Sequence, residues 1–235
     1  MAGRRYVETF DGGPGGWLGC KGNGLDGVVA PEVKDGALVS RSPWWIDYNH
    51  APPGGGYLNL FFGLLTTREG YGPHAAKAGA NRFVEGGYPL DWTNARITVR
   101  IKGDLHLRGT KVQLLAQAQV GDKWVNCVLT GQPLVVAPNW TEQTIRLVPD
   151  PDQWQCIGSH VSRMDRYGWG EAAEVLRDLN GDIIFVLFPV DVVPAEPVEG
   201  NPHHLRAGED YAVDTSRLPE GYVMMDTIQI EFAEG

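Results

Sequence analysis

The densest group of side chains that could do chemistry lies in residues 42–57, where aromatic and polar residues precede a Pro-Pro-Gly-Gly-Gly turn. Sugars have apolar C–H faces and hydroxyl rims, so a sugar site needs an aromatic platform with fixed polar groups around it. Trp45 and Tyr48 could supply the platform, and Asp47 and His50 the polar groups. Trp45 follows another tryptophan, and in an extended segment at least one of the two should point into the core. The segment predicts a carbohydrate-binding surface.

A second group of polar residues lies in the long loop predicted for residues 66–87. Its most informative member is Arg82, because a guanidinium can hold a carboxylate, such as that of a uronic acid, with two hydrogen bonds. The alternative is a solvated surface arginine that pairs with Glu85. Arg82 is therefore a predicted ligand-binding residue with a structural alternative.

A third group lies in residues 159–169, which include His160 and Trp169. If loops from one end of the molecule converge, Trp169 would add a facing aromatic surface. His50, His74 and His160 could then serve as acid and base or bind a transition metal, although no HxH or HExxH spacing supports a metal. The sequence contains no Gly-x-Ser-x-Gly elbow and no phosphate-binding loop, so His50 and His160 are the catalytic candidates only if the protein is an enzyme.

The elements that must position these loops have strand patterns. Strict apolar/polar alternation predicts half-buried strands, and continuous apolar runs bounded by Gly or Pro predict strands covered on both sides. The alternating or mixed segments are residues 95–102, 111–120, 124–129, 142–148 and 223–232, and the apolar runs are 57–65 and 183–188. One stretch, residues 171–179, has helical spacing and ends at Asn-Gly.

Glycine and proline account for 47 of the 235 residues without any repeat period, which is typical of many turns between short strands. We therefore expect an all-β fold, an antiparallel β-sandwich (jelly-roll) with one short helix and long loops at 66–87 and 194–214. Residues 1–235 would form a single domain, a size that all-β sandwiches often reach.

Polar residues on two of the predicted strands could form one concave, sugar-binding face, with a simple solvated sheet face as the alternative. These residues are Arg96, Thr98, Arg100, Gln113, Gln117 and Gln119.

Composition limits the partners and the compartment. The net charge of −9 argues against nucleic acid and against docking on anionic lipid. The longest apolar run, residues 183–190, is too short to span a bilayer.

Cys20, Cys127 and Cys156 are odd in number and widely spaced, which predicts buried free thiols rather than disulfides or a zinc site. With no secretory signal visible, we expect a cytoplasmic protein.

Several short motifs occur in an order that resembles the galactose-binding-like jelly-roll superfamily, which includes many carbohydrate-binding modules and laminin-IV-like domains. They are Phe10-Asp-Gly-Gly with Gly16-Trp17, Asp35-Gly-Ala-Leu-Val, Leu90-Asp-Trp, Trp140, Leu176-Arg-Asp-Leu, and Met225-Asp-Thr-Ile-Gln-Ile. The resemblance implies the sandwich fold and, by analogy, sugar recognition.

The same resemblance implies a structural calcium ion where the first and last strands meet. The matching carboxylates here are Glu8 or Asp11 with Asp226, since hard oxygen ligands on adjoining strands suit calcium. Asp226 shares the parity of Ile228 and Ile230, so its carboxylate is expected on the interior side of the last strand. The alternative is that Asp226 caps a turn or accepts backbone N–H bonds.

The leading hypothesis is a protein that recognises an oligosaccharide or acidic sugar through Trp45, Asp47, Tyr48, His50 and Arg82, with Trp169 from a facing loop. One alternative is a lyase or hydrolase that acts on a sugar or related small molecule with a histidine base. The other is a structural domain that associates with itself. The sequence does not determine the oligomeric state.

Overall fold

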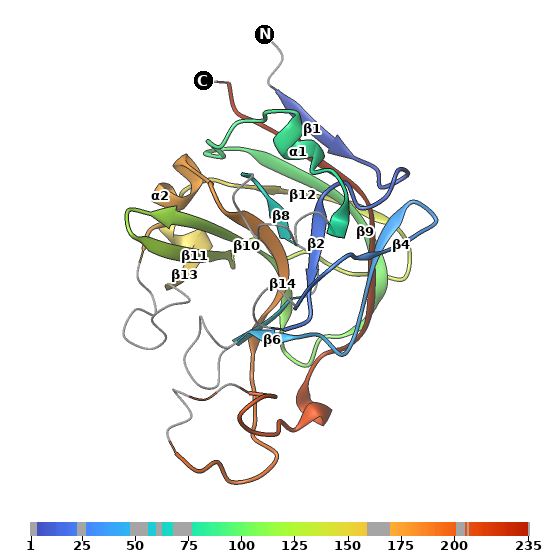
Figure 1. Ribbon diagram of the computed structural model, residues 1–235, viewed down its shortest axis with the longest axis vertical. Coiled ribbons are helices and arrows are strands. Elements are labelled where there is room, and N and C mark those ends of the chain that lie inside the picture. Colours follow the sequence, from blue (N-terminus) through green and yellow to red (C-terminus); the bar gives the residue numbers. More distant parts are fainter. Residues whose placement is uncertain are drawn as a thin grey trace.

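The computed structural model describes residues 4–22, 27–47, 56–59, 63–67, 77–158, 170–200, 205 and 207–234. Two antiparallel sheets pack face to face, as Figure 1 shows, so the predicted all-β sandwich is confirmed.

The first sheet has the order β12-β9-β15-β5-β4, and β1 pairs with β15 beyond the part of β15 that contacts β5. Its strands are β1 (Arg5–Glu8), β4 (Glu32–Lys34), β5 (Ala37–Arg41), β9 (Arg96–His106), β12 (Thr141–Arg146) and β15 (Glu220–Glu231). The N-terminal and C-terminal strands are therefore neighbours.

The second sheet has the order β13-β11-β10-β14-β8-β2-β3, and β7 joins β6 to β14 beside β8. Its strands are β2 (Trp17–Cys20), β3 (Val28–Val29), β6 (Ile46–Asp47), β7 (Gly56–Asn59), β8 (Gly63–Leu65), β10 (Lys111–Val120), β11 (Lys123–Leu129), β13 (Trp154–Gly158) and β14 (Asp182–Val190). The run 57–65, predicted as one strand, is divided between β7 and β8.

Alternation along β9 and β10 builds the core between the sheets. Ile97 and Val99 of β9 and Leu114 and Ala116 of β10 are fully buried in one apolar cluster. Complete burial of each large aliphatic side chain contributes roughly 1.5–3 kcal/mol, so these positions determine which face of each strand points inwards.

The central strand β14 is buried on both faces, as its continuous apolar sequence predicts. Phe185 and Leu187 point into the core between the sheets, and Ile184 and Val186 point to the outer face of the second sheet. There they form a second buried cluster, whose members are Leu115, Val128, Ile157, Ile184, Val186 and Phe188.

The prediction that the polar residues of two strands form one solvated sheet face is wrong. Arg96, Thr98 and Arg100 lie on β9 of the first sheet, whereas the glutamines lie on β10 of the second. Gln113 is only 2% exposed, because the outer face of the second sheet is largely apolar and buried.

Two short helices accompany the sheets (Figure 1). The predicted helix is confirmed as α2 (Ala172–Arg177), which buries Val175. The segment 66–87, predicted as a loop, also contains the helix α1 (Arg82–Glu85). Its N-terminus is capped by Asn81, whose side chain accepts hydrogen bonds from the N–H groups of Phe83 and Val84 at 3.0 and 3.1 Å. Within the described residues, no helix is long and apolar enough to cross a membrane.

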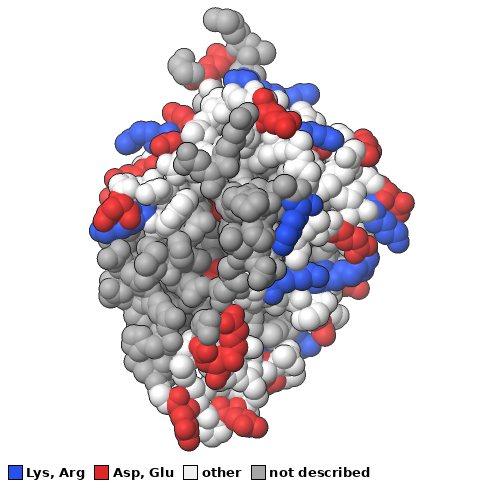
Figure 2. All heavy atoms as spheres, in the orientation of Figure 1, with Lys and Arg blue, Asp and Glu red and all other residues white. Residues whose placement is uncertain are grey.

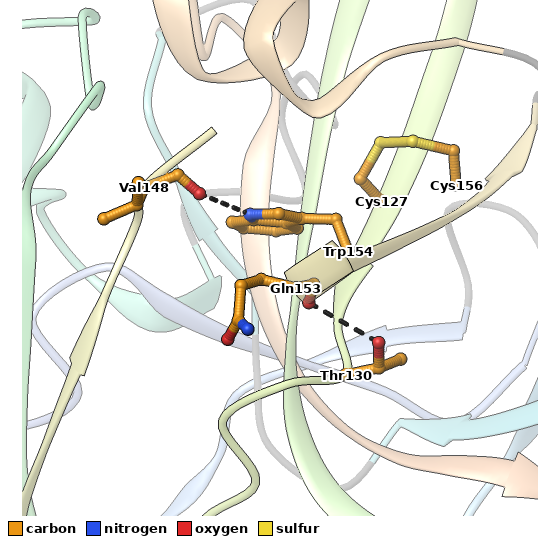
Figure 3. The surroundings of a disulfide bond; sticks show 6 residues. All are labelled: Cys127, Thr130, Val148, Gln153, Trp154 and Cys156. Atoms are coloured by element: carbon orange, nitrogen blue, oxygen red, sulfur yellow. Dashed lines mark hydrogen bonds between the residues drawn. A yellow bond between two sulfur atoms is a disulfide. The ribbon is translucent and has the colours of Figure 1, made fainter. Parts of the chain in front are cut away.

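Two of the three cysteines form a disulfide, so the prediction of free thiols is wrong for Cys127 and Cys156. They face each other on the paired strands β11 and β13, a register that spacing along the chain does not reveal. Figure 3 shows the disulfide near Trp154, whose indole N–H donates to the carbonyl of Val148 at 2.8 Å. The cytoplasmic location stays a prediction, and disulfides are more typical of oxidising compartments.

Candidate functional site

Of the predicted aromatic-polar segment, residues 42–57, the structure describes residues 42–47 and the first two residues of β7. Trp44 is buried in the core and donates its indole N–H to Ser40 Oγ at 2.8 Å, which confirms that one of the two adjacent tryptophans is a core residue. Trp45 is half-buried, and Asp47 on β6 is only 5% exposed. The remaining predicted residues of this site and the histidines proposed for catalysis lie outside the described residues: Tyr48, His50, His74, His160 and Trp169.

The second sheet also buries a carboxyl group that the sequence pattern did not single out. Asp182 is the first residue of β14 and is 3% exposed. Strand alternation places it on the outer face with Ile184 and Val186, because Ile183 points into the core. Its Oδ1 atom is buried and has no hydrogen-bond partner in the described part of the chain. Such an acceptor destabilises a fold by roughly 1–3 kcal/mol, so its presence needs an explanation.

The backbone around Asp182 is tightly held. Asn180 accepts a hydrogen bond from the Gln119 N–H at 2.8 Å, and Thr66 N–H donates to the Gly181 carbonyl at 3.0 Å. The hydroxyl of Thr66 also donates to the carbonyls of Leu179 and Gly181. Position 181 must be glycine, because a Cβ there would lie 2.9 Å from the Trp124 ring and closer still to a β10 carbonyl. Asp182 therefore has a fixed position rather than an adaptable one.

Asp182 and Asp47 both lie near the thiol of Cys20. The thiol of Cys20, at the end of β2, is free. Burial raises the pKa of this thiol to about 12, and repulsion from the carboxylates of Asp182 and Asp47 contributes. Both carboxylates must therefore lie within electrostatic reach of one sulfur atom. We call Cys20, Asp47 and Asp182 the outer-face site.

Burial has a direct effect on the ionisation of Asp182. Loss of solvation raises the pKa of its carboxyl group from the ordinary 3.8 to about 7. Near neutral pH this carboxyl group can therefore either donate or accept a hydrogen bond.

Further polar and aromatic groups adjoin the outer-face site. Asn126, Gln117 and Asp182 occupy one row across β11, β10 and β14. Trp124, half-buried at the start of β11, reaches Gly181. Gln117 was named from the sequence, but Asn126 and Asp182 were missed, although an aspartate at the start of the apolar run of β14 was a visible signal.

The structure does not bring Arg82 together with Trp45 and Asp47. Figure 1 shows α1 at the upper end of the molecule, near the chain termini, and β6 towards the lower end. Arg82 does hold a carboxylate, but it is that of Glu8 in β1, at 2.7 Å, rather than that of Glu85. The role of Arg82 in ligand binding stays a prediction.

The carboxylates predicted for calcium have other partners. Oε1 of the fully buried Glu8 accepts hydrogen bonds from the N–H groups of Thr9 and Phe10, both at 3.1 Å, in addition to Arg82. The Thr9 hydroxyl donates to Asp11 at 2.8 Å. Glu8 Oε1 and Asp11 Oδ2 therefore have partners within the protein.

Asp226 occupies a β-bulge in β15, where the register shifts between Met225 and Thr227. The extra residue breaks the alternation, so the expected interior position of Asp226 is wrong. Its Oδ2 atom pairs with Arg100 on the solvent-facing side of β9, whereas its Oδ1 atom is buried and has no hydrogen-bond partner among the described residues. Among the described residues, no group of three or more His, Cys, Asp or Glu side chains could hold a metal ion. Calcium binding by Glu8 or Asp11 with Asp226 stays a prediction.

Comparison with known proteins gives similarity in fold only. No protein-family model matches the chain, and no curated protein matches it. The solved structures it resembles include the L4b domain of human laminin alpha-2, at 10% identity and a TM-score of 0.39, with 98% of each chain covered.

Two further structures show weaker similarity. One is CtCBM11, at 11% identity and a TM-score of 0.31, with all of this chain and 86% of the other covered. The other is Rv0315 of Mycobacterium tuberculosis, described as a pseudo beta-1,3-glucanase, at 13% identity and a TM-score of 0.29, with both chains covered completely. At these values the likeness carries no argument about a ligand.

Proposed function

We propose that this protein recognises a carbohydrate at the outer-face site of the second sheet. The observation that carries the proposal is Asp182, a fixed and buried carboxyl group whose Oδ1 has no partner in the described part of the chain. A sugar hydroxyl both donates and accepts, so it can satisfy this group in either protonation state.

The surroundings of Asp182 support a sugar over a purely apolar ligand. Asp47 is a second buried carboxylate, and Trp45 and Trp124 are half-buried indoles adjoining the two acidic positions. Hydroxyl groups suit the carboxylates, and indole rings suit the C–H faces of a pyranose. The uncharged Gln117 beside Asp182 adds both a donor and an acceptor.

The test begins with a thermal-shift screen of the purified protein against a panel of oligosaccharides. A ligand that binds only the folded state raises its melting temperature as the site fills. For the best sugar, Asp182→Ala should weaken affinity at least tenfold, because a hydrogen bond to a charged group contributes roughly 1.5–3 kcal/mol. Asp104→Ala, at an exposed aspartate of β9, is the matched control and should leave affinity unchanged. Equal affinity in wild type and Asp182→Ala would contradict the proposal.

An enzymatic role is the second candidate, and one observation favours it. A carboxyl group with a pKa of about 7, as at Asp182, is suited to donating a proton to a leaving group. Product analysis of each bound sugar after prolonged incubation separates the two functions. Shortened or unsaturated products that disappear in Asp182→Ala would establish an enzyme, and unchanged sugars would leave a binding protein.

A further inference from the structure

One row of charged side chains crosses four strands of the first sheet. In register, Arg146 of β12 pairs with Arg96 of β9, and Arg96 pairs with Glu231 of β15. Glu231 in turn pairs with Arg5 of β1. Each of the four is the chain neighbour of a core residue of its own strand, so alternation directs all four side chains to the solvent-facing side. We call Arg5, Arg96, Arg146 and Glu231 the arginine row.

Two members of the arginine row carry like charges at directly opposed positions. Arg146 and Arg96 lie on neighbouring antiparallel strands, where the Cβ atoms of opposed residues are about 4.5–5.5 Å apart. Like charges at that separation destabilise a sheet. Elsewhere on the same two strands opposed charges differ in sign, because Glu142 pairs with Arg100. An anion bound between the guanidinium groups of Arg96 and Arg146 would remove the repulsion.

The ion pairs within the described part of the chain do not neutralise the arginine row. Neither Arg5 nor Arg146 takes part in one, and Arg96 has a single pair, from its Nε to Oε2 of Glu231 at 3.9 Å. Oε1 of Glu231 accepts a hydrogen bond from the Gln229 side chain at 2.7 Å. The terminal N–H groups of Arg96 and Arg146 therefore have no acceptor among the described residues.

The neighbours of the arginine row add little negative charge. The next row on the same face is uncharged and consists of Thr144, Thr98, Gln229 and Val7. Figure 2 shows acidic side chains at the lower end of the molecule, whereas basic side chains are visible at the upper end, where Figure 1 shows β1 and both chain termini. The chain has a net charge of −9, so three arginines with one glutamate are a local surplus of positive charge.

A pocket of about 390 Å³ adjoins the arginine row. The row contributes three of its lining residues, and Asn94 and residues 232–234 contribute the rest. Phe232 is apolar and buried, and the Asn94 amide can donate to a ligand oxygen. Glu231 and Glu234 also line the pocket, and their carboxylates disfavour an anion inside it. An anionic group therefore fits between Arg96 and Arg146, with an uncharged remainder of the ligand in the pocket.

We propose that Arg96 and Arg146 bind a tetrahedral oxyanion, the sulfate or phosphate group of a monoester, whose uncharged remainder lies in the adjoining pocket. Each guanidinium group can bind two oxygen atoms of an anion with a planar pair of N–H groups. A tetrahedral oxyanion has enough oxygen atoms for two arginines, whereas the two oxygen atoms of a carboxylate satisfy only one. This site lies on the first sheet and is independent of the sugar site proposed on the second.

The first experiment measures the melting temperature of the purified protein in millimolar sodium sulfate, phosphate or acetate. Ionic strength is held at about 0.15 M with sodium chloride, so that screening is equal in all samples. Sulfate or phosphate at about ten times its dissociation constant should raise the melting temperature by roughly 3–6 °C. An equal effect of acetate, or no effect of either oxyanion, overturns the proposal.

Variants assign the effect to the arginine row. Arg96→Gln and Arg146→Gln should each weaken oxyanion binding about tenfold. Arg96→Lys keeps the charge but loses the planar pair of N–H groups, so it should also weaken binding. In chloride alone, Arg146→Gln should melt at a higher temperature than the wild type, because it removes the like-charge pair. Arg177→Gln, at an exposed arginine of α2, is the matched control and should bind as the wild type does.

An oxyanion response that is the same in wild type, Arg96→Gln and Arg146→Gln overturns the proposal, because sulfate and phosphate also stabilise folded proteins by general exclusion from their surface. Asp182→Ala should leave this response unchanged. Failure of the oxyanion site therefore leaves the proposed sugar site standing, and failure of the sugar site leaves the oxyanion site standing.

The last arm identifies the source of the oxyanion with glucose 6-sulfate, glucose 6-phosphate and glucose. At least one ester should bind more tightly than its inorganic ion, since its remainder gains contacts with Phe232 and Asn94 in the pocket. The tighter ester shows whether the site takes sulfate or phosphate esters, and both should lose affinity in Arg96→Gln. Esters that bind no better than the inorganic ions would contradict the placement of the remainder in the pocket.

Discussion

Replacing Asp182 with asparagine should change how the stability of the protein depends on pH. Burial raises the pKa of this carboxyl group from 3.8 to about 7, so the folded protein holds the proton more tightly than the unfolded chain. The stability that this proton provides is fully present below about pH 4 and is lost as the pH rises to about 7. The difference between the two pKa values corresponds to about 4 kcal/mol. Asparagine has the same shape and no charge, so the variant should avoid this loss.

Urea unfolding of the wild type and Asp182→Asn at unit steps from pH 4 to pH 8 measures this effect. The free energy of unfolding of the variant minus that of the wild type should rise by about 1.4 kcal/mol per pH unit between pH 4 and 7, and then level off. Other titrating groups cancel in this difference, and Asp104→Asn, at an exposed position, should give a flat line. Parallel curves for the wild type and Asp182→Asn would refute the reasoning, because Asp182 would then be as well solvated in the folded protein as in the unfolded chain.

Three further predictions concern groups outside the outer-face site. Arg82→Ala should lower the free energy of unfolding by about 2–3 kcal/mol in urea denaturation, since it leaves buried Glu8 without its counter-charge; a change under 0.5 kcal/mol would show that the backbone N–H groups suffice. Non-reducing peptide mapping should find Cys127 linked to Cys156, and reduction should destabilise the protein by about 3–4 kcal/mol, given their separation of 29 residues. Two free thiols in that map would contradict the structure. If Glu8, Asp11 and Asp226 bind calcium, millimolar calcium should raise the melting temperature and EDTA should reverse the rise; an unchanged melting temperature would contradict the calcium prediction.

The fold was largely predictable because the burial of a strand determines the pattern of apolar and polar residues along it. Alternation in β9 and the continuous apolar run of β14 follow from one-sided and two-sided burial. β10 alternates as well, although its outer face is also buried at Gln113 and Leu115. Which strands share a sheet was not predictable, because alternation gives the face of a strand and not its partner. The polar residues of β9 and β10 were therefore grouped wrongly, and the pairing of Cys127 with Cys156 was missed.

The candidate site was predictable only where it coincides with a dense cluster along the chain. Trp45 and Asp47 were selected because aromatic and polar residues crowd that segment. Asp182 was missed, since its significance depends on burial and on the absence of a described partner for Oδ1, which are properties of packing. Asp226 was misjudged because a single bulge reversed the side to which its carboxylate points.

The most direct test of sugar recognition at the outer-face site compares two half-buried tryptophans, one directly before β6 of the second sheet and one directly before β12 of the first. Trp45 adjoins Asp47, whereas Trp140 contacts Arg100 and Lys102 of β9, with the cations 4.8 and 4.6 Å from its ring. Calorimetric titration with the best sugar of the panel should show at least a thirtyfold loss of affinity in Trp45→Ala, since a central tryptophan commonly contributes about 2 kcal/mol or more. Trp140→Ala should bind as the wild type does. Unchanged affinity in Trp45→Ala, or a loss confined to Trp140→Ala, would contradict a sugar site on the second sheet.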